Sequence, residues 1–163
     1  MTRARIITKI GDVFSVPLDG GSKKYFQYVA NDLTQLNSSV IRAFKSTYPI
    51  DSSPDLLQVV AGDVDFYAHV VLKWGIKMKL WERVGNLSFT DKLDVLFRAS
   101  NDYGNPSIKT YHNWRVWKIG EDDQRVGKLG GEYLKAEIGV VVDPPSVVHR
   151  LRTGEYSFVY PGY

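Results

Sequence analysis

Two carboxylates, a phenol and an imidazole recur at every second position of one short segment, as Asp63, Asp65, Tyr67 and His69. Alternate residues of a β-strand share a face and lie roughly 6–7 Å apart at Cα, so these side chains would stand in a row. Carboxylates and an imidazole in such a row can share a metal ion or position a water molecule. One hypothesis is therefore a metal-dependent hydrolase that uses Asp63, Asp65 and His69.

The residues between these polar positions are apolar, which predicts a strand over Asp63–Leu72. They are Val64, Phe66, Ala68, Val70 and Leu72. Strict alternation is typical of a half-buried antiparallel strand, because a helix would scatter the apolar residues around its circumference. The plainer interpretation of the polar residues is then the exposed face of this strand. That face is the predicted partner-binding surface.

A second candidate for partner contact is the pair Trp114 and Trp117, separated by Arg115 and Val116. Tryptophan and arginine are enriched in the residues that dominate binding energy at interfaces. Two residues three positions apart in a strand point to opposite faces, so we expect one tryptophan in the core and the other partly exposed. The alternative is that both pack in the core.

Lysines and tryptophans interleave in the segment Lys73–Arg83. If it is a strand, Lys73, Lys77 and Lys79 share a face, and lysines of this kind protect an edge strand from pairing. Aromatic and basic residues together can also bind single-stranded nucleic acid. The edge-strand interpretation is favoured, so nucleic acid is not the expected partner, but a nucleic-acid-binding module stays open as an alternative.

The sequence predicts a single domain over residues 1–163, of α+β class and mainly β. Its expected architecture is a twisted antiparallel sheet, or a small partly open barrel, with one or two short helices. A helix is expected around Val147, Val148 and Leu151, with Gly154 as its stop. The expected strands are Asp12–Pro17, Lys24–Ala30, Ser39–Lys45, Asp63–Leu72, Trp114–Ile119, Arg125–Leu129, Ile138–Val142 and Tyr156–Tyr160.

Composition narrows the function classes. The chain has no cysteine, which excludes disulfides, thiolate nucleophiles and cysteine-bound zinc. Neither a Gly-x-Ser-x-Gly elbow nor a His-Glu-x-x-His motif occurs, so no catalytic residues and no cofactor are predicted. No apolar run approaches the roughly 18 residues of a membrane span, and we expect a cytoplasmic protein without a membrane partner. The net charge is +3.

Several short motifs together resemble the immunity protein 26 family of bacterial polymorphic toxin systems. They are Ile10-Gly-Asp-Val-Phe-Ser-Val-Pro-Leu18, Tyr25-Phe-Gln-Tyr-Val29, Ser39-Val-Ile-Arg-Ala-Phe44, Asp65-Phe-Tyr-Ala-His69, Trp74-Gly75 with Trp81, Trp114-Arg-Val-Trp117, and the tail from Pro145 through His149-Arg150 to Gly154-Glu-Tyr156. The resemblance implies a protein that binds a cognate protein toxin and blocks it without catalysis.

The positive net charge sets a condition on that function. Inhibitors that cover the basic active site of a nuclease are usually acidic. We therefore expect either local acidic contacts, at Asp63, Asp65 and Glu121–Asp123, or a toxin that is not a basic nuclease.

Overall fold

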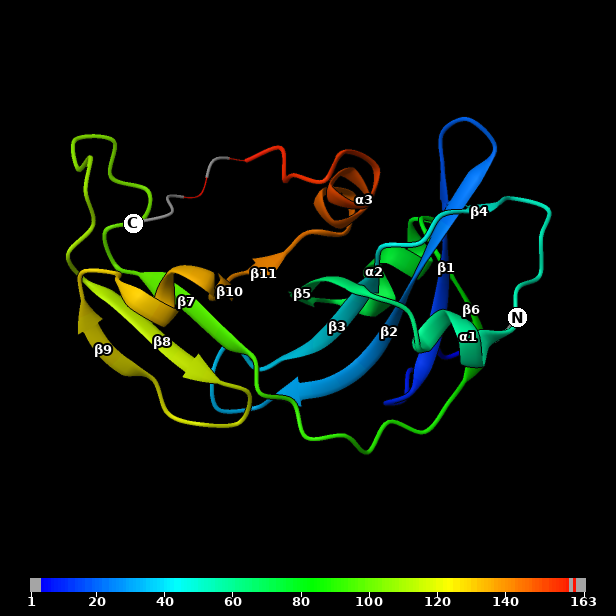
Figure 1. The fold of residues 1–163 in the computed structure, drawn as a ribbon, viewed down its shortest axis with the longest axis horizontal. Coiled ribbons are helices and arrows are strands. Elements are labelled where there is room, and N and C mark those ends of the chain that lie inside the picture. Colours follow the sequence, from blue (N-terminus) through cyan, green and yellow to red (C-terminus); the bar gives the residue numbers. More distant parts are fainter. Residues whose placement is uncertain (1–3, 159, 161–163) are drawn as a thin grey trace.

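Two sheets that lie side by side form the body of the protein (Figure 1). The computed structural model describes residues 4–158 and 160. The larger sheet has the strand order β11-β5-β3-β2-β1-β6, with β4 pairing with β2, and the smaller has the order β10-β7-β8-β9. All pairs are antiparallel except β11 with β5 and β10 with β7. The strands are β1 Asp12–Leu18, β2 Ser22–Asp32, β3 Ser38–Phe44, β4 Tyr48–Pro49, β5 Val64–Val70, β6 Glu82–Asn86, β7 Leu96–Ser100, β8 Trp114–Lys118, β9 Gln124–Gly127, β10 Glu137–Ile138 and β11 Val141–Val142.

The predicted α+β, mainly β class is confirmed. Of the two expected architectures, the open antiparallel sheet is nearer to the structure than the barrel, but the strands form two sheets instead of one, and these do not close into a barrel. The described residues form three α-helices rather than one or two: α1 Leu56–Val60, α2 Leu72–Lys77 and α3 Pro144–Thr153, with a short 3₁₀ helix at Gly131–Lys135. No helix of the described chain has the length and apolar character needed to cross a membrane.

Local sequence signals explain the best-defined elements. Gly20 and Gly21 both have φ +74°, a conformation that favours glycine, and they reverse the chain between β1 and β2. Helix α3 is capped at its N-terminus by Asp143, whose carboxylate accepts hydrogen bonds from the backbone N–H and the hydroxyl of Ser146. It ends at Gly154 with φ 89°, so the predicted helix and its stop are confirmed.

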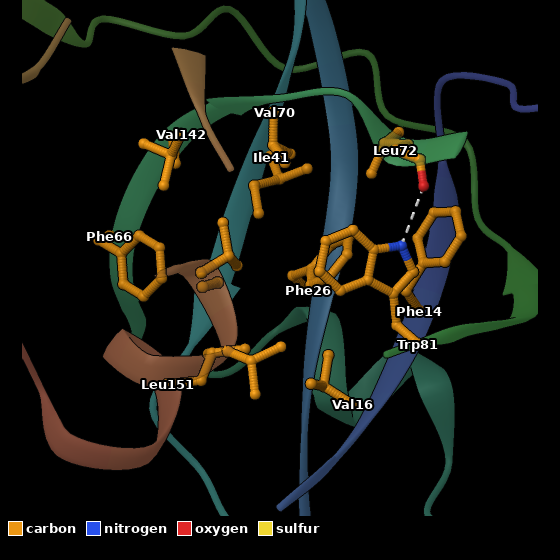
Figure 2. Close-up of a cluster of buried hydrophobic side chains, with 14 of the residues drawn as sticks. Phe14, Val16, Phe26, Ile41, Phe66, Val70, Leu72, Trp81, Val142 and Leu151 are labelled. Carbon is orange, nitrogen blue, oxygen red and sulfur yellow. Dashed lines mark hydrogen bonds between the residues drawn. The ribbon is translucent and has the colours of Figure 1, made fainter. Parts of the chain in front are cut away.

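One core fills the space between a face of the larger sheet and helices α2 and α3 (Figure 2). Phe26 lies at its centre, with its ring stacked on Phe14 at 5.1 Å and edge-on to Trp81 at 5.0 Å. The indole N–H of Trp81 donates to the backbone oxygen of Leu72 at 3.2 Å. This bond fixes the loop after α2 against the first residue of the helix.

A second core joins the two sheets. Val29 and Val40 of the larger sheet pack against Phe97, Ala99 and Trp117 of the smaller one. The other face of the larger sheet is therefore covered as well. The smaller sheet therefore buries residues that the sequence predicted to be exposed.

The strands predicted over Asp63–Leu72 and Tyr156–Tyr160 differ from the structure. Strand β5 ends at Val70, and Leu72 begins α2. The described residues of Tyr156–Tyr160 are irregular, and residue 159 lies outside the described chain.

Candidate functional site

His69 belongs to a buried polar cluster, not to an exposed face. Its Nε2–H donates to Asp32 Oδ2 at 2.9 Å, and the indole N–H of Trp117 donates to the same oxygen at 2.8 Å. The other carboxylate oxygen of Asp32 accepts from the backbone N–H groups of Gly120 and Gln35. Asp32 and His69 are fully buried and Trp117 is 2% exposed. One carboxylate thus joins β2, β5 and β8 across the two sheets.

This position corrects the expectation that His69 is accessible to a partner. The alternation along β5 is real, but the smaller sheet covers the face that carries His69: its ring lies 4.3 Å from that of Phe97, centroid to centroid. Burial lowers the pKa of His69, and the hydrogen bond that His69 donates to Asp32 offsets only part of that effect. The imidazole is therefore neutral at pH 7, and its Nδ1 has no hydrogen-bond partner within the described chain.

The remaining members of the predicted face do not converge on His69. Asp63 is exposed just before β5, while Asp65 and Tyr67 are half-buried. Burial is also the main cause of the raised pKa of Tyr67. Within residues 4–158 and 160, no group of three or more His, Asp or Glu side chains could hold a metal ion. Asp63, Asp65 and His69 are thus not brought together as a metal-ligand set.

Near Asp65 the structure places a carboxylate that the sequence did not single out. Burial raises the pKa of Glu137 on β10, and the Asp65 carboxylate adds to that rise, while Arg150 opposes it. The nearest Glu137 oxygen and Arg150 nitrogen are 4.0 Å apart. Arg150 also stacks over the rings of Phe66 and Tyr156. The side chains at this edge of β5 mainly compensate one another, which leaves little free charge for a partner.

Both candidate tryptophans are buried. Trp114 is 1% exposed and Trp117 is 2% exposed. They do point to opposite faces of β8, since Trp117 lies in the core between the sheets and Trp114 lies in a separate cluster with Tyr111, Val116 and Leu129. The expectation that one is partly exposed is wrong, and the alternative that both pack in the core is the one found, because the loop after β7 and the chain near Leu129 cover the outer face.

The smaller sheet instead presents an acidic groove, which we define by Asp94, Glu121, Asp122 and Glu132. The groove has a volume of about 460 Å³ and contains two cations, Lys118 and Lys135. Its other lining residues are Val95, Leu96, Val116, Trp117, Gln124, Tyr133 and Ala136. Lys118 contacts Asp94 at 2.5 Å. Asp94 is the main cause of the raised pKa of Lys118, and Glu121 and Glu132 contribute.

The four groove carboxylates outnumber the two lysines beside them, Lys118 and Lys135. In the described chain, Asp94 is the only one of the four in a salt bridge. All four residues are exposed. Of the acidic contacts predicted at Glu121–Asp123, Glu121 and Asp122 line the groove. Asp123 does not, and it pairs with Arg115 at 3.4 Å. Asp94 and Glu132 were missed, because only the folded path of the chain brings them beside Glu121.

The lysine-rich segment is also placed differently from expectation. Lys73 and Lys77 lie on helix α2, and the edge strand β6 begins only at Glu82. The edge-strand interpretation of these lysines is therefore wrong. Trp81 is buried, whereas Trp74 is 63% exposed.

Comparison with known proteins adds no family to this picture: no family model, no curated protein and no solved structure matches the chain. The resemblance to the immunity protein 26 family therefore stays a prediction.

Proposed function

We propose that this chain is a non-enzymatic, cytoplasmic binding protein that neutralises a cognate protein toxin by covering a basic site on it. The observation that supports the proposal most directly is the acidic groove. An inhibitor of positive net charge needs a local acidic surface to cover a basic site, and the groove supplies one, with four carboxylates against two lysines on a chain of net charge +3.

The groove has the features of a site for cationic side chains. Charge complementarity accelerates association and disfavours wrong partners. A volume of about 460 Å³ lies in the range of sites that hold a small ligand, so on a protein partner it takes one or two side chains rather than a whole element. Tyr133 is half-buried in the groove wall, where its ring can stack on a guanidinium. An arginine or lysine from the active site of a basic toxin fits this chemistry.

The fold anchors the turn that carries two of the groove carboxylates. Glu121 and Asp122 lie in the turn between β8 and β9, whose Gly120 N–H is bound to buried Asp32 at 3.2 Å. Thr34 donates to the backbone oxygen of the same glycine at 3.0 Å. Preorganisation of this kind reduces the entropy lost on binding.

The test is binding and protection with the product of the adjacent reading frame. We expect a complex that weakens at higher salt, and survival of cells that express both proteins. The double variant Glu121→Lys/Asp122→Lys should weaken binding at least about tenfold, because like charges then meet. Asp51→Lys replaces an exposed carboxylate after β4; it is a control outside the groove with half the charge change, and it should bind normally.

Two results would overturn the proposal. One is the absence of both binding and protection. The other is a complex that tolerates the Glu121→Lys/Asp122→Lys change as well as it tolerates Asp51→Lys, since the groove would then not be the contact.

The metal-dependent hydrolase has no comparable support. Its three residues are separated by the burial of His69 under the smaller sheet, while Asp63 remains at the surface. The nucleic-acid alternative gains an observation of its own, and it concerns a different surface.

A further inference from the structure

Helix α2 carries an exposed aromatic surface that no part of the proposed toxin contact uses. Trp74 is 63% exposed, whereas Trp81, Trp114 and Trp117 are 3%, 1% and 2% exposed. No ring stacking or cation contact involves Trp74 within the described residues. An indole this open to water keeps most of its ring surface free to contact a ligand.

Three lysines lie close to this indole in the sequence, on α2 and just after it. We define the Trp74 patch as Lys73, Trp74, Lys77, Met78 and Lys79, all of which are exposed. Lys73 and Lys77 are four residues apart on a helix and so lie on one side of it. The segment from Val71 to Trp81 contains no Asp or Glu. The patch therefore combines one free aromatic face with three ammonium groups.

The patch sits on a firmly held support. Gly75 lies directly against the Trp81 ring: a Cβ at this position would be 1.9 Å from a ring carbon. Trp81 is in turn bonded to Leu72, as Figure 2 shows. The N–H of Leu80 donates to the oxygen of Gly75 at 2.9 Å and closes the helix, with Lys79 at φ 58°. The backbone that carries Trp74 and the lysines is thus held in place.

We propose that the Trp74 patch binds single-stranded nucleic acid, with a base stacked on the Trp74 indole and backbone phosphates on the three lysines. Stacking on aromatic rings beside a basic surface is the usual way in which single strands are held without sequence preference. Lysine is depleted in the cores of protein interfaces, which disfavours a protein at this patch. The edge-strand explanation for the lysines no longer applies, because they lie on α2 and its C-terminal turn.

The first measurement uses the exposed indole as a reporter. Titration of the whole protein with unlabelled (dT)12 at low salt should quench the emission of Trp74, since the other three indoles are buried. The logarithm of the affinity should fall with the logarithm of the salt concentration with a slope of about −2, which corresponds to three phosphates on a single strand.

Variants then locate the contact by anisotropy of fluorescein-labelled (dT)12. Trp74→Ala should weaken binding roughly five- to 150-fold, the range for loss of one stacked base. Lys73→Glu/Lys77→Glu should abolish binding at moderate salt. The control Lys109→Glu/Lys128→Glu changes two exposed lysines of the smaller-sheet region by the same charge and should retain most of the affinity. Glu121→Lys/Asp122→Lys should leave binding intact, which separates this site from the proposed toxin contact.

Several outcomes would overturn the assignment. One is no quenching by (dT)12 or (rU)12 at low salt. Another is equal loss of affinity in the lysine pair and its control, which would indicate diffuse attraction to a basic chain. Quenching as strong with poly-glutamate, or with vesicles of anionic lipid, would show that the patch recognises acidic proteins or membranes instead.

Discussion

The carboxylate of Asp32 and the indole N–H of Trp117 are joined by a 2.8 Å hydrogen bond that connects the last residue of β2 to the penultimate residue of β8. Both residues are buried. Because the acceptor is a buried carboxylate that also binds His69 and two backbone N–H groups, this bond helps to hold one sheet on the other.

Trp117→Phe tests how much that hydrogen bond contributes to the free energy of unfolding. We expect a loss of about 1.5–3 kcal/mol in the free energy of unfolding, the range for a hydrogen bond to a charged group, in addition to the loss of packed ring volume. Trp114→Phe is the matched control: Trp114 is equally buried, and its indole N–H has no hydrogen-bond partner in the described chain. Urea unfolding of both variants measures the difference. Equal losses would show that the Asp32 contact contributes little.

The pH dependence of stability follows from His69. Its pKa is lowered in the folded protein, whereas an unfolded histidine titrates near 6.5. Below about pH 6.5 this histidine therefore binds a proton in the unfolded chain but not in the folded protein. The free energy of unfolding should fall by about 1.4 kcal/mol per pH unit from there down to the folded pKa, and level off below it.

His69→Gln removes this component while its amide can still donate to Asp32. Urea unfolding between pH 7.5 and pH 5 should show a shallower slope for His69→Gln than for the parent chain. His112→Gln changes an exposed histidine and should keep the parent slope. A slope unaltered by His69→Gln would mean that other groups set the acid sensitivity.

The elements that sequence patterns predicted are those encoded locally. The hairpin at Gly20 and Gly21, the alternation along β5 and the α3 stop at Gly154 each depend on a few consecutive residues. All three are present in the structure.

The sequence patterns could not show which residues cover each face of a strand. Alternation places His69 beside Tyr67, but the residues that bury it, Phe97 and Trp117, come from distant strands. The same holds for the acidic groove, where Asp94 and Glu132 join Glu121 only through folding.

In the Lys73–Arg83 segment, two patterns of residue spacing indicate different secondary structures. The lysines at odd-numbered positions suggested a strand. Leu72, Ile76 and Leu80, by contrast, recur every four residues as in a helix, and they pack against the core. The structure follows this second pattern.

Gly75→Ala tests the support of the Trp74 patch. The added methyl group would overlap the Trp81 ring, which the bond to Leu72 and the contact with Phe26 hold in place. We expect a net loss of about 1–3 kcal/mol, although alanine favours helix more than glycine does. Gly130→Ala is the control, since no atom lies within 4 Å of its added methyl group and its φ of −163° suits any residue. Thermal unfolding of the two variants compares them, and similar melting temperatures would contradict this packing.

Lys79→Gly should separate stability from binding. Lys79 has φ 58°, a conformation that costs a residue with a side chain about 1–2 kcal/mol. Glycine relieves this strain but has more freedom to lose on folding, so we expect a gain of roughly 0.5–1 kcal/mol in urea unfolding. The same change removes one of three lysines from the Trp74 patch. The salt slope for (dT)12 should therefore drop from about −2 to about −1.4.

Lys79→Ala is the companion variant for this last experiment. It removes the ammonium group but keeps a side chain at φ 58°, so its stability should stay within about 0.5 kcal/mol of the parent, while its salt slope should match that of Lys79→Gly. If both variants kept the parent slope, Lys79 would not contact phosphate, and the three-lysine geometry of the patch would be wrong. If Lys79→Ala gained as much stability as Lys79→Gly, charge repulsion among the lysines rather than backbone strain would be the source of the gain.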